Sequence, residues 1–265
     1  MARVTQPIGD GSRRGIPLRA VTPNAVTALA LCFGLSAVRF AIAAKWELAV
    51  AVVVVAGVLD GLDGRIARLL RGESRFGAEL DSLSDVIAFG VAPAVVLYLW
   101  SLQFMPQFGW TIALSHAVCC ALRLARFNAQ IDITEQPRKA AGFMTGIPAP
   151  AGAGTALTPL YLWLATGEDL FRSTYVVAPW TASVALLMVS SIPTYGWSSL
   201  RLRRGVRFGA LVAFAIFASA LINAPWPSLS ALSLCYLAAI PLAIRSYARI
   251  KRRTATAADV RATPA

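Results

Sequence analysis

Long apolar runs dominate the sequence, and their lengths constrain the fold more than any other feature. Each run has the ~17–25 residues that a helix needs to cross a hydrocarbon core. Only helices and closed barrels satisfy every backbone polar group in lipid, so such runs predict membrane-spanning helices. The predicted spans are residues 23–43, 47–70, 80–102, 109–128, 147–166, 175–197, 206–223 and 228–246. The sequence therefore predicts an all-α, polytopic transmembrane helix bundle of about eight spans.

Composition supports a membrane protein and argues against a nucleic-acid partner. Hydrophobic residues make up 57% of the chain and charged residues 14%, which is too apolar for a soluble protein of this size. The net charge of +12 is spread over short connections and forms no basic patch with interleaved aromatics. The four cysteines lie in apolar runs without metal-ligand spacing, so we expect neither a disulfide nor thiol chemistry.

The distribution of Lys and Arg predicts the orientation. Of the 25 basic residues, 22 fall at the termini or in alternate connections, and only Arg39, Lys45 and Arg172 fall elsewhere. By the positive-inside rule, both termini and the connection after the second span are cytoplasmic. We expect a multi-pass protein of the inner (cytoplasmic) membrane, in contact with membrane lipids. The basic and apolar residues 12–20 predict an N-terminal interfacial segment, with a plain basic tail as the alternative.

Four aspartates beside these apolar runs predict a metal site. Asp60 and Asp63 are three residues apart and Asp81 and Asp85 are four apart, so each pair lies on one face of a helix. From the distance along the helices, Asp60 and Asp85 should be the deeper pair. Carboxylates at bilayer depth repel one another unless cations are bound between them. Oxygen ligands without Cys or His favour Mg²⁺, Mn²⁺ or Ca²⁺, and two such ions would suit phosphoryl chemistry.

The stretch from Asp60 to Asp85 also resembles the signature of the CDP-alcohol phosphotransferases, D-x2-D-G-x2-A-R-x8-G-x3-D-x3-D. The resemblance implies an integral membrane enzyme that moves a phosphatidyl-type group from a CDP-lipid to an alcohol and releases CMP. It implies that Asp60, Asp63 and Asp81 hold two divalent ions, Mg²⁺ or Mn²⁺. Asp85 would share one ion and act as the general base. The alternative is that the aspartates cap helix ends and pair with nearby arginines.

Small and basic residues around the aspartates are candidates for binding the CDP-lipid. Gly64 and Ala67 would let a nucleotide approach the helix backbone, although close helix packing is the alternative. The Arg68 guanidinium suits a pyrophosphate. In the resembled family, a Pro-Asn-x-x-Thr element such as that ending at Thr27 contacts the nucleotide; otherwise it is a helix start, with Pro in the first turn. The CDP-lipid candidates are Asn24, Thr27, Gly64, Ala67, Arg68 and Gly77.

Stretches outside the signature are similar to the bacterial members that use serine. These are residues 80–93, 123–128 and 146–150, and they imply CDP-diacylglycerol and L-serine as substrates of phospholipid biosynthesis. The implied acceptor contacts are Arg123, Arg126, Phe127 and Asn128. Read without the resemblance, the arginines are anchors that snorkel to the interface. Sister enzymes that use glycerol phosphate, inositol phosphate or choline share the aspartate motif, and the family also suggests a homodimer.

The chain is expected to have four parts, and one other class of function competes with the enzyme. The parts are a cytoplasmic tail with the interfacial segment (1–22), a catalytic six-helix membrane domain (23–197), two additional helices (198–246) and a basic tail (247–265). Intramembrane carboxylates also occur in divalent-cation transporters. However, the acidic residues near the outer ends of the spans are only Glu47, Glu168 and Asp169, and none lies between these and the aspartate cluster. His116 is expected to be a packed or hydrogen-bonded residue.

Overall fold

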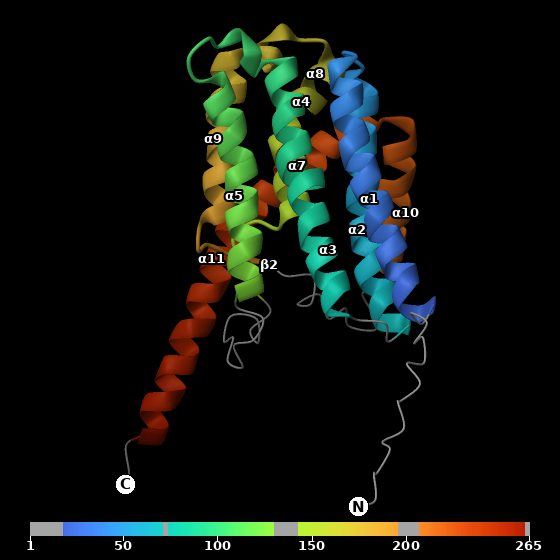
Figure 1. Ribbon diagram of the computed structural model, residues 1–265. Coiled ribbons are helices and arrows are strands. Elements are labelled where there is room, and N and C mark those ends of the chain that lie inside the picture. The colour runs from blue at the N-terminus through green and yellow to red at the C-terminus, as the bar shows by residue number, and fades with distance from the viewer. Residues whose placement is uncertain (1–17, 71–73, 130–142, 196–206, 263–265) are drawn as a thin grey trace, which may run out of the picture.

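Long helices run side by side in the computed structural model, which describes residues 18–70, 74–129, 143–195 and 207–262 (Figure 1). The first group of helices is α1 (Leu18–Ile42), α2 (Trp46–Leu70), α3 (Arg75–Asp85), α4 (Ala92–Trp100) and α5 (Gly109–Ala129). The second group is α7 (Ala149–Ala156), α8 (Thr158–Thr166), α9 (Thr174–Val189), α10 (Arg207–Asn223) and α11 (Pro225–Ala262). Two short 3₁₀ helices, η2 (Leu102–Phe104) and η3 (Asp169–Arg172), lie in connections.

Every predicted span contains helix, so the all-α bundle is confirmed in its coarse form. Three helices are long and apolar enough to cross a membrane, namely Thr22–Ile42, Arg75–Trp100 and Pro225–Arg249. Thr174–Val189 and Phe208–Asn223 are shorter apolar helices. The number of eight spans stays a prediction, and most of the expected interfacial segment lies outside the described residues.

A two-stranded antiparallel sheet interrupts the helices and was not predicted. Strand β1 (Phe143–Thr145) pairs with β2 (Pro193–Tyr195), with Met144 opposite Thr194. The predicted sixth span, 175–197, is therefore wrong at its C-terminal end, because α9 ends at Val189. Pro193 offers no backbone N–H and disfavours helical geometry in the residue before it, which explains the early end.

The third predicted span is a composite helix. A π-helix, η1 (Val86–Val91), joins α3 to α4 directly after Asp85. In an α-helix the Phe89 carbonyl would accept from residue 93, but that residue is Pro93 and has no N–H. The buried His116 ring supplies the contact, with Nε2 3.2 Å from the Phe89 carbonyl oxygen. The expectation that His116 is a hydrogen-bonded residue is thus confirmed.

Two further differences from the predicted helices involve prolines. Helix α1 begins at Leu18, so Pro23 lies inside it, and the expectation of Pro23 in the first turn is wrong. The predicted span 147–166 is two helices, and Pro159 lies in the first turn of the second. Helix α11 continues through Pro241 to Ala262, and the candidate membrane span within it, Pro225–Arg249, contains the predicted span 228–246. Pro225 begins α11, where the N–H groups have no partner within the helix.

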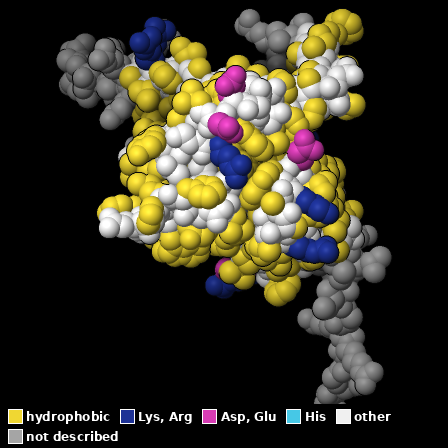
Figure 2. All heavy atoms as spheres, turned by 90° about the horizontal axis from the view of Figure 1, so that it is seen from above, with side chains coloured by type: hydrophobic (Ala, Val, Ile, Leu, Met, Phe, Trp, Pro, Cys, Tyr) yellow, Lys and Arg dark blue, Asp and Glu magenta, His cyan; other side chains and the backbone are white. Residues whose placement is uncertain are grey.

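Helix α1 organises the part of the bundle that carries the aspartates. It packs along α2 and also contacts α3, α4 and η1. A Cβ built on Gly34 would lie only 2.7 Å from the Cα of Ala88, so glycine permits this close approach. The start of α1, the end of α2, the start of α3 and the ends of α5 and α11 lie at one end of the molecule (Figure 1). The opposite end shows mainly hydrophobic side chains with a few scattered charges (Figure 2).

Candidate active site

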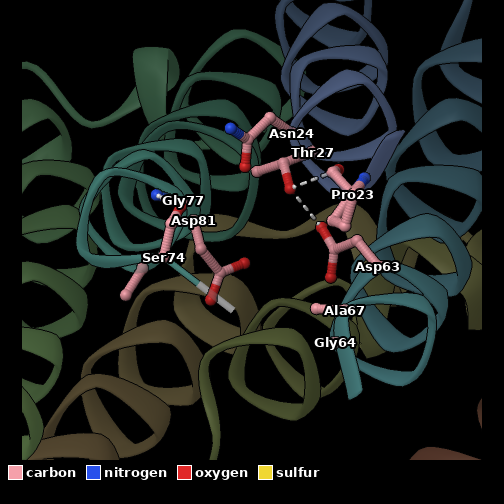
Figure 3. A pocket seen from close by; sticks show the side chains of 10 residues that line it. Pro23, Asn24, Thr27, Asp63, Gly64, Ala67, Ser74, Gly77 and Asp81 are labelled. Carbon is pink, nitrogen blue, oxygen red and sulfur yellow. Dashed lines mark hydrogen bonds between the residues drawn. The ribbon is translucent and has the colours of Figure 1, made fainter. Parts of the chain in front are cut away.

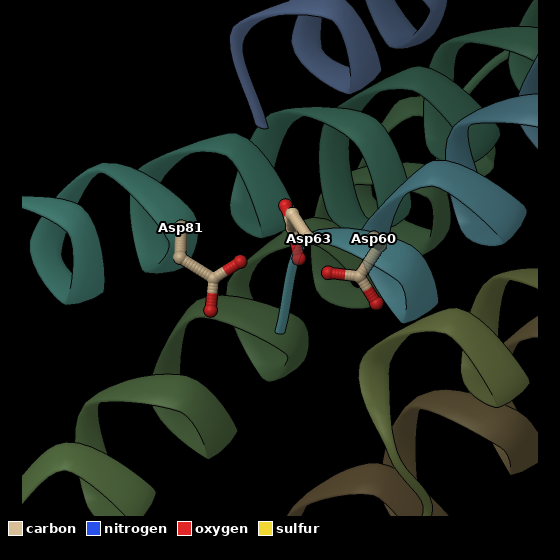
Figure 4. Close-up of side chains that lie close together, drawn as sticks. All are labelled: Asp60, Asp63 and Asp81. Carbon is tan, nitrogen blue, oxygen red and sulfur yellow. The ribbon is translucent and has the colours of Figure 1, made fainter. Parts of the chain in front are cut away.

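Three carboxylates converge between α2 and α3, as the sequence predicted. Asp60 and Asp63 come from α2 and Asp81 from α3, and one oxygen of each lies within 4.8 Å of the others (Figure 4). Asp63 is buried and the other two are half-buried. Three carboxylates this close repel one another unless a cation lies among them. Hard oxygen donors with this spacing fit a divalent cation such as Mg²⁺, Mn²⁺ or Ca²⁺.

Asp85 stands beside this cluster. It lies one turn after Asp81, is 9% exposed, and its side chain interacts directly with that of Asp60. The expectation that Asp60 and Asp85 are the deeper pair in the membrane stays a prediction. Because Asp85 is outside the group of three converging oxygens, its role as a shared metal ligand remains a prediction.

A pocket of about 280 Å³ opens next to the cluster, between α1, α2 and α3 (Figure 3). Its lining includes five of the six CDP-lipid candidates, namely Asn24, Thr27, Gly64, Ala67 and Gly77. Asp63 and Asp81 point into it from opposite sides (Figure 3). The Thr27 hydroxyl donates to Asp63 Oδ2 at 2.7 Å. Thr27 therefore links the predicted nucleotide element on α1 to the carboxylate cluster.

Arg68 is the one CDP-lipid candidate that does not line the pocket. Its Nε donates to the Gly64 carbonyl at 2.9 Å and its side chain is exposed. The guanidinium therefore lies along its own helix, against the backbone of a residue that lines the pocket. Its contact with a pyrophosphate stays a prediction.

Ser74 lines the pocket, and the sequence analysis missed it. It is the N-cap of α3, and its hydroxyl accepts from the Gly77 N–H at 3.0 Å. A Cβ built on Gly77 would lie 2.8 Å from Asn24 Oδ1, so glycine allows α1 and the start of α3 to meet here. A serine three residues before this glycine is an N-cap signal. The amides of a first helical turn favour phosphate groups, which fits a pocket for a CDP-lipid.

Of the four acceptor candidates, only Arg123 reaches the carboxylates. It is 7% exposed and lies close enough to Asp60 and Asp85 for electrostatic interaction. Arg126 instead donates to the carbonyl groups at the end of α9, at 2.8 Å to Val189 and 3.2 Å to Ser190. These bonds hold the end of α5 against the end of α9.

The other two acceptor candidates lie at the end of α5. Asn128 donates to the Ser82 hydroxyl at 2.9 Å and so ties α5 to α3. Phe127 is 43% exposed. Their contacts with an acceptor remain predictions.

Comparison with known proteins identifies the family. A family model described as CDP-alcohol phosphatidyltransferase matches residues 20–190, which contain the cluster, the pocket and Arg123. The chain belongs to the CDP-alcohol phosphatidyltransferase family. A model described as CDP-alcohol phosphatidyltransferase 2 matches residues 206–241, on α10 and α11. Membership in this family identifies the chain as a transferase of phospholipid biosynthesis.

Similar proteins with the name CDP-diacylglycerol–serine O-phosphatidyltransferase occur in several organisms. One from Mycobacterium tuberculosis is 41% identical over 234 residues, which cover 88% of this chain and 81% of the relative. One from Mycobacterium leprae is 41% identical over 235 residues, covering 89% of this chain and 78% of the relative. One from Methanocaldococcus jannaschii is 38% identical over 135 residues, covering 51% and 57%. The similarity to the mycobacterial proteins thus extends over most of this phosphatidyltransferase.

Proposed function

We propose that this phosphatidyltransferase is a phosphatidylserine synthase, which transfers the phosphatidyl group from CDP-diacylglycerol to L-serine and releases CMP. The observation that carries the proposal is the 41% identity to mycobacterial proteins of that name over 88% of the chain. The site supports it, because a carboxylate cluster with the geometry to hold a divalent cation lies beside a buried arginine. Serine carries one carboxylate, which a single guanidinium can bind through paired hydrogen bonds.

The donor side of the site is the pocket between α1, α2 and α3. Asn24, Thr27, Gly64, Ala67 and Gly77 receive the cytidine diphosphate part of the donor. Asp60, Asp63 and Asp81 would hold two divalent ions, Mg²⁺ or Mn²⁺, and Asp85 would be a further ligand. When bound, such ions neutralise the pyrophosphate and the departing CMP. Thr27 fixes the orientation of Asp63 through its 2.7 Å hydrogen bond.

The acceptor side is formed by Asp85 and Arg123. Asp85 takes the proton of the serine hydroxyl, whose oxygen then attacks the lipid-side phosphorus of the donor. The new P–O bond forms as the bond from that phosphorus to the CMP oxygen breaks, and CMP leaves with the electron pair. Arg123 holds the serine carboxylate, so that the hydroxyl faces Asp85.

The proposed location is the inner (cytoplasmic) membrane, with the site open to the cytoplasm. This orientation rests on the asymmetry of Lys and Arg in the sequence. Its support is that the helix ends flanking the pocket lie at the same end of the molecule as the ends of α5 and α11 (Figure 1). The homodimer suggested by the resemblance stays a prediction.

Product analysis of the purified protein tests the function. CDP-diacylglycerol is supplied in vesicles with L-serine, glycerol 3-phosphate, inositol phosphate or choline, and the lipid products and CMP are measured by mass spectrometry. We expect phosphatidylserine with equimolar CMP, and loss of activity on chelation that Mg²⁺ or Mn²⁺ restores. Faster lipid formation with another acceptor would contradict the serine assignment, whereas full activity after chelation would contradict the metal role.

A further inference from the structure

Arg123 is a buried, positively charged residue with a nitrogen that is unpaired among the described residues. The side chain is 7% exposed, and its Nε has no hydrogen-bond partner in the part of the chain that the structure describes. Burying a charged or polar group without hydrogen bonds is costly, so such groups usually have a partner, either in the protein or in a ligand. Asp60 and Asp85 lie nearby, but in the proposed function they serve the metal ions and the acceptor proton. Arg123 therefore has hydrogen-bonding capacity left for a ligand anion.

Helix α11 brings a tyrosine hydroxyl to this arginine from outside residues 20–190. Tyr236 is half-buried, its hydroxyl oxygen is inaccessible to solvent, and it lies within electrostatic range of Arg123. The hydroxyl lies next to Thr194 on β2, but no described group has the geometry of a regular hydrogen bond to it. A buried tyrosine hydroxyl usually finds a hydrogen-bond partner. Tyr236 and Arg123 can therefore both donate hydrogen bonds to a ligand in the same small region.

The position of Tyr236 is fixed by contacts on both sides. Helix α11 packs against α7, α8 and β2. One turn before Tyr236, the Ser233 hydroxyl donates to the Gly154 carbonyl at 3.3 Å. On the facing strand, the Thr194 hydroxyl donates to the Gly146 carbonyl at 2.7 Å. Tyr236 is therefore held by packed elements and does not depend on a free loop.

We propose that Tyr236 is an acceptor-binding residue, which donates its hydroxyl hydrogen to the acceptor carboxylate held by Arg123. Helix α11 then completes the acceptor side of the site, and the ligand is a small α-amino acid with a free carboxylate. This inference rests on the proposed function. It adds that acceptor recognition depends on a helix beyond the part of the chain that carries the aspartates.

The test compares Tyr236→Phe with Tyr175→Phe in the full-length enzyme. Tyr236→Phe removes one hydroxyl and keeps the ring. A hydrogen bond to a charged group contributes enough that the serine KM should rise about tenfold or more. The KM for CDP-diacylglycerol and the melting temperature should stay unchanged. Tyr175 is 89% exposed on α9, so Tyr175→Phe should leave all three values unchanged.

Ser233→Ala separates acceptor binding from simple packing of α11. It breaks the bond to Gly154 and leaves the Tyr236 hydroxyl in place. If Ser233→Ala raises the serine KM as much as Tyr236→Phe does, α11 acts only through packing and the inference is overturned. If the wild-type enzyme uses serine and Tyr236→Phe leaves the serine KM unchanged, the role of Tyr236 is overturned but the proposed function is not. A wild-type enzyme that prefers an acceptor without a carboxylate overturns the proposed function as well.

Discussion

Gly61 and Gly64 offer a matched pair of residues for testing the donor pocket. They lie three residues apart on α2, but only Gly64 lines the pocket. A Cβ built on either glycine meets no heavy atom within 4 Å. Alanine in a helix is about 0.5–1 kcal/mol more favourable than glycine, so both alanine variants should be at least as stable as the wild type.

We expect Gly64→Ala to raise the KM for CDP-diacylglycerol, because its methyl group occupies space that the nucleotide needs. Gly61→Ala should leave that KM unchanged. Steady-state kinetics and thermal unfolding of both variants provide the measurement. Equal kinetics in the two variants would mean that the donor does not approach this face of α2.

Asp85→Asn tests the assignment of the general base. The amide keeps the size of the side chain and one ligand oxygen but cannot accept the serine proton. Turnover should fall by ~10²–10⁴-fold, the usual contribution of a positioned base. Affinity for CDP-diacylglycerol, measured by equilibrium binding, should change far less. A parallel loss of binding and turnover would leave Asp85 as a metal ligand alone.

At the scale of residues, helical spacing predicted those parts of the site that lie on one helix or on two neighbouring helices. Asp60, Asp63 and Asp81 meet as expected because fixed spacings put their carboxylates on defined helix faces. Ser74 was missed although its N-cap signal is local. Tyr236 could not be found, because it lies 113 positions after Arg123 in the sequence and only tertiary packing brings the two together.

The π-helix η1 begins at the residue after Asp85. We therefore expect the position of Asp85 to depend on η1 more than on any other element. His116→Ala removes the donor to the Phe89 carbonyl, and the loss of this buried hydrogen bond should cost about 1 kcal/mol or more of stability. Turnover should also fall, because η1 sets the direction of α3 relative to α4. Ser115→Ala is the control, since the Ser115 hydroxyl donates to the carbonyl of Ile112 in its own helix.

Thermal unfolding in detergent and steady-state kinetics measure both effects of the His116 change. His116→Gln keeps an N–H donor and should recover part of the stability. A His116→Ala enzyme with unchanged stability and turnover would show that the π-helix does not depend on this contact.

At the scale of elements, run length predicted where helices occur but not how they are interrupted. Pro93 is visible in the sequence, but its consequence depends on His116, which lies in another helix. The pairing of β1 with β2 joins segments 48 positions apart. Apolar composition carries no signal for such pairing, because the strands are only three residues long.

The topology of the whole molecule gives a further prediction. Reporter fusions after Arg75 and at the C-terminus should be cytoplasmic, and a fusion near Asp169 should lie on the opposite side. The end of α2 and the end of α11 lie at one end of the bundle, and the connection between α8 and α9 lies at the other (Figure 1). Paired alkaline phosphatase and fluorescent protein fusions provide the measurement. Signals from Arg75 and Asp169 on the same side would contradict the eight-span topology.

The position of the donor pocket at the ends of α1, α2 and α3 also determines how the two substrates arrive. Apolar side chains are exposed along these helices, among them Leu29, Leu69 and Leu83. An acyl chain can lie against such a surface while its headgroup enters the pocket. The donor then arrives by lateral diffusion in two dimensions, and serine arrives from solution in three. At a fixed total amount of CDP-diacylglycerol, added inert lipid should slow the reaction by lowering the donor's mole fraction, whereas the response to serine follows its concentration by volume.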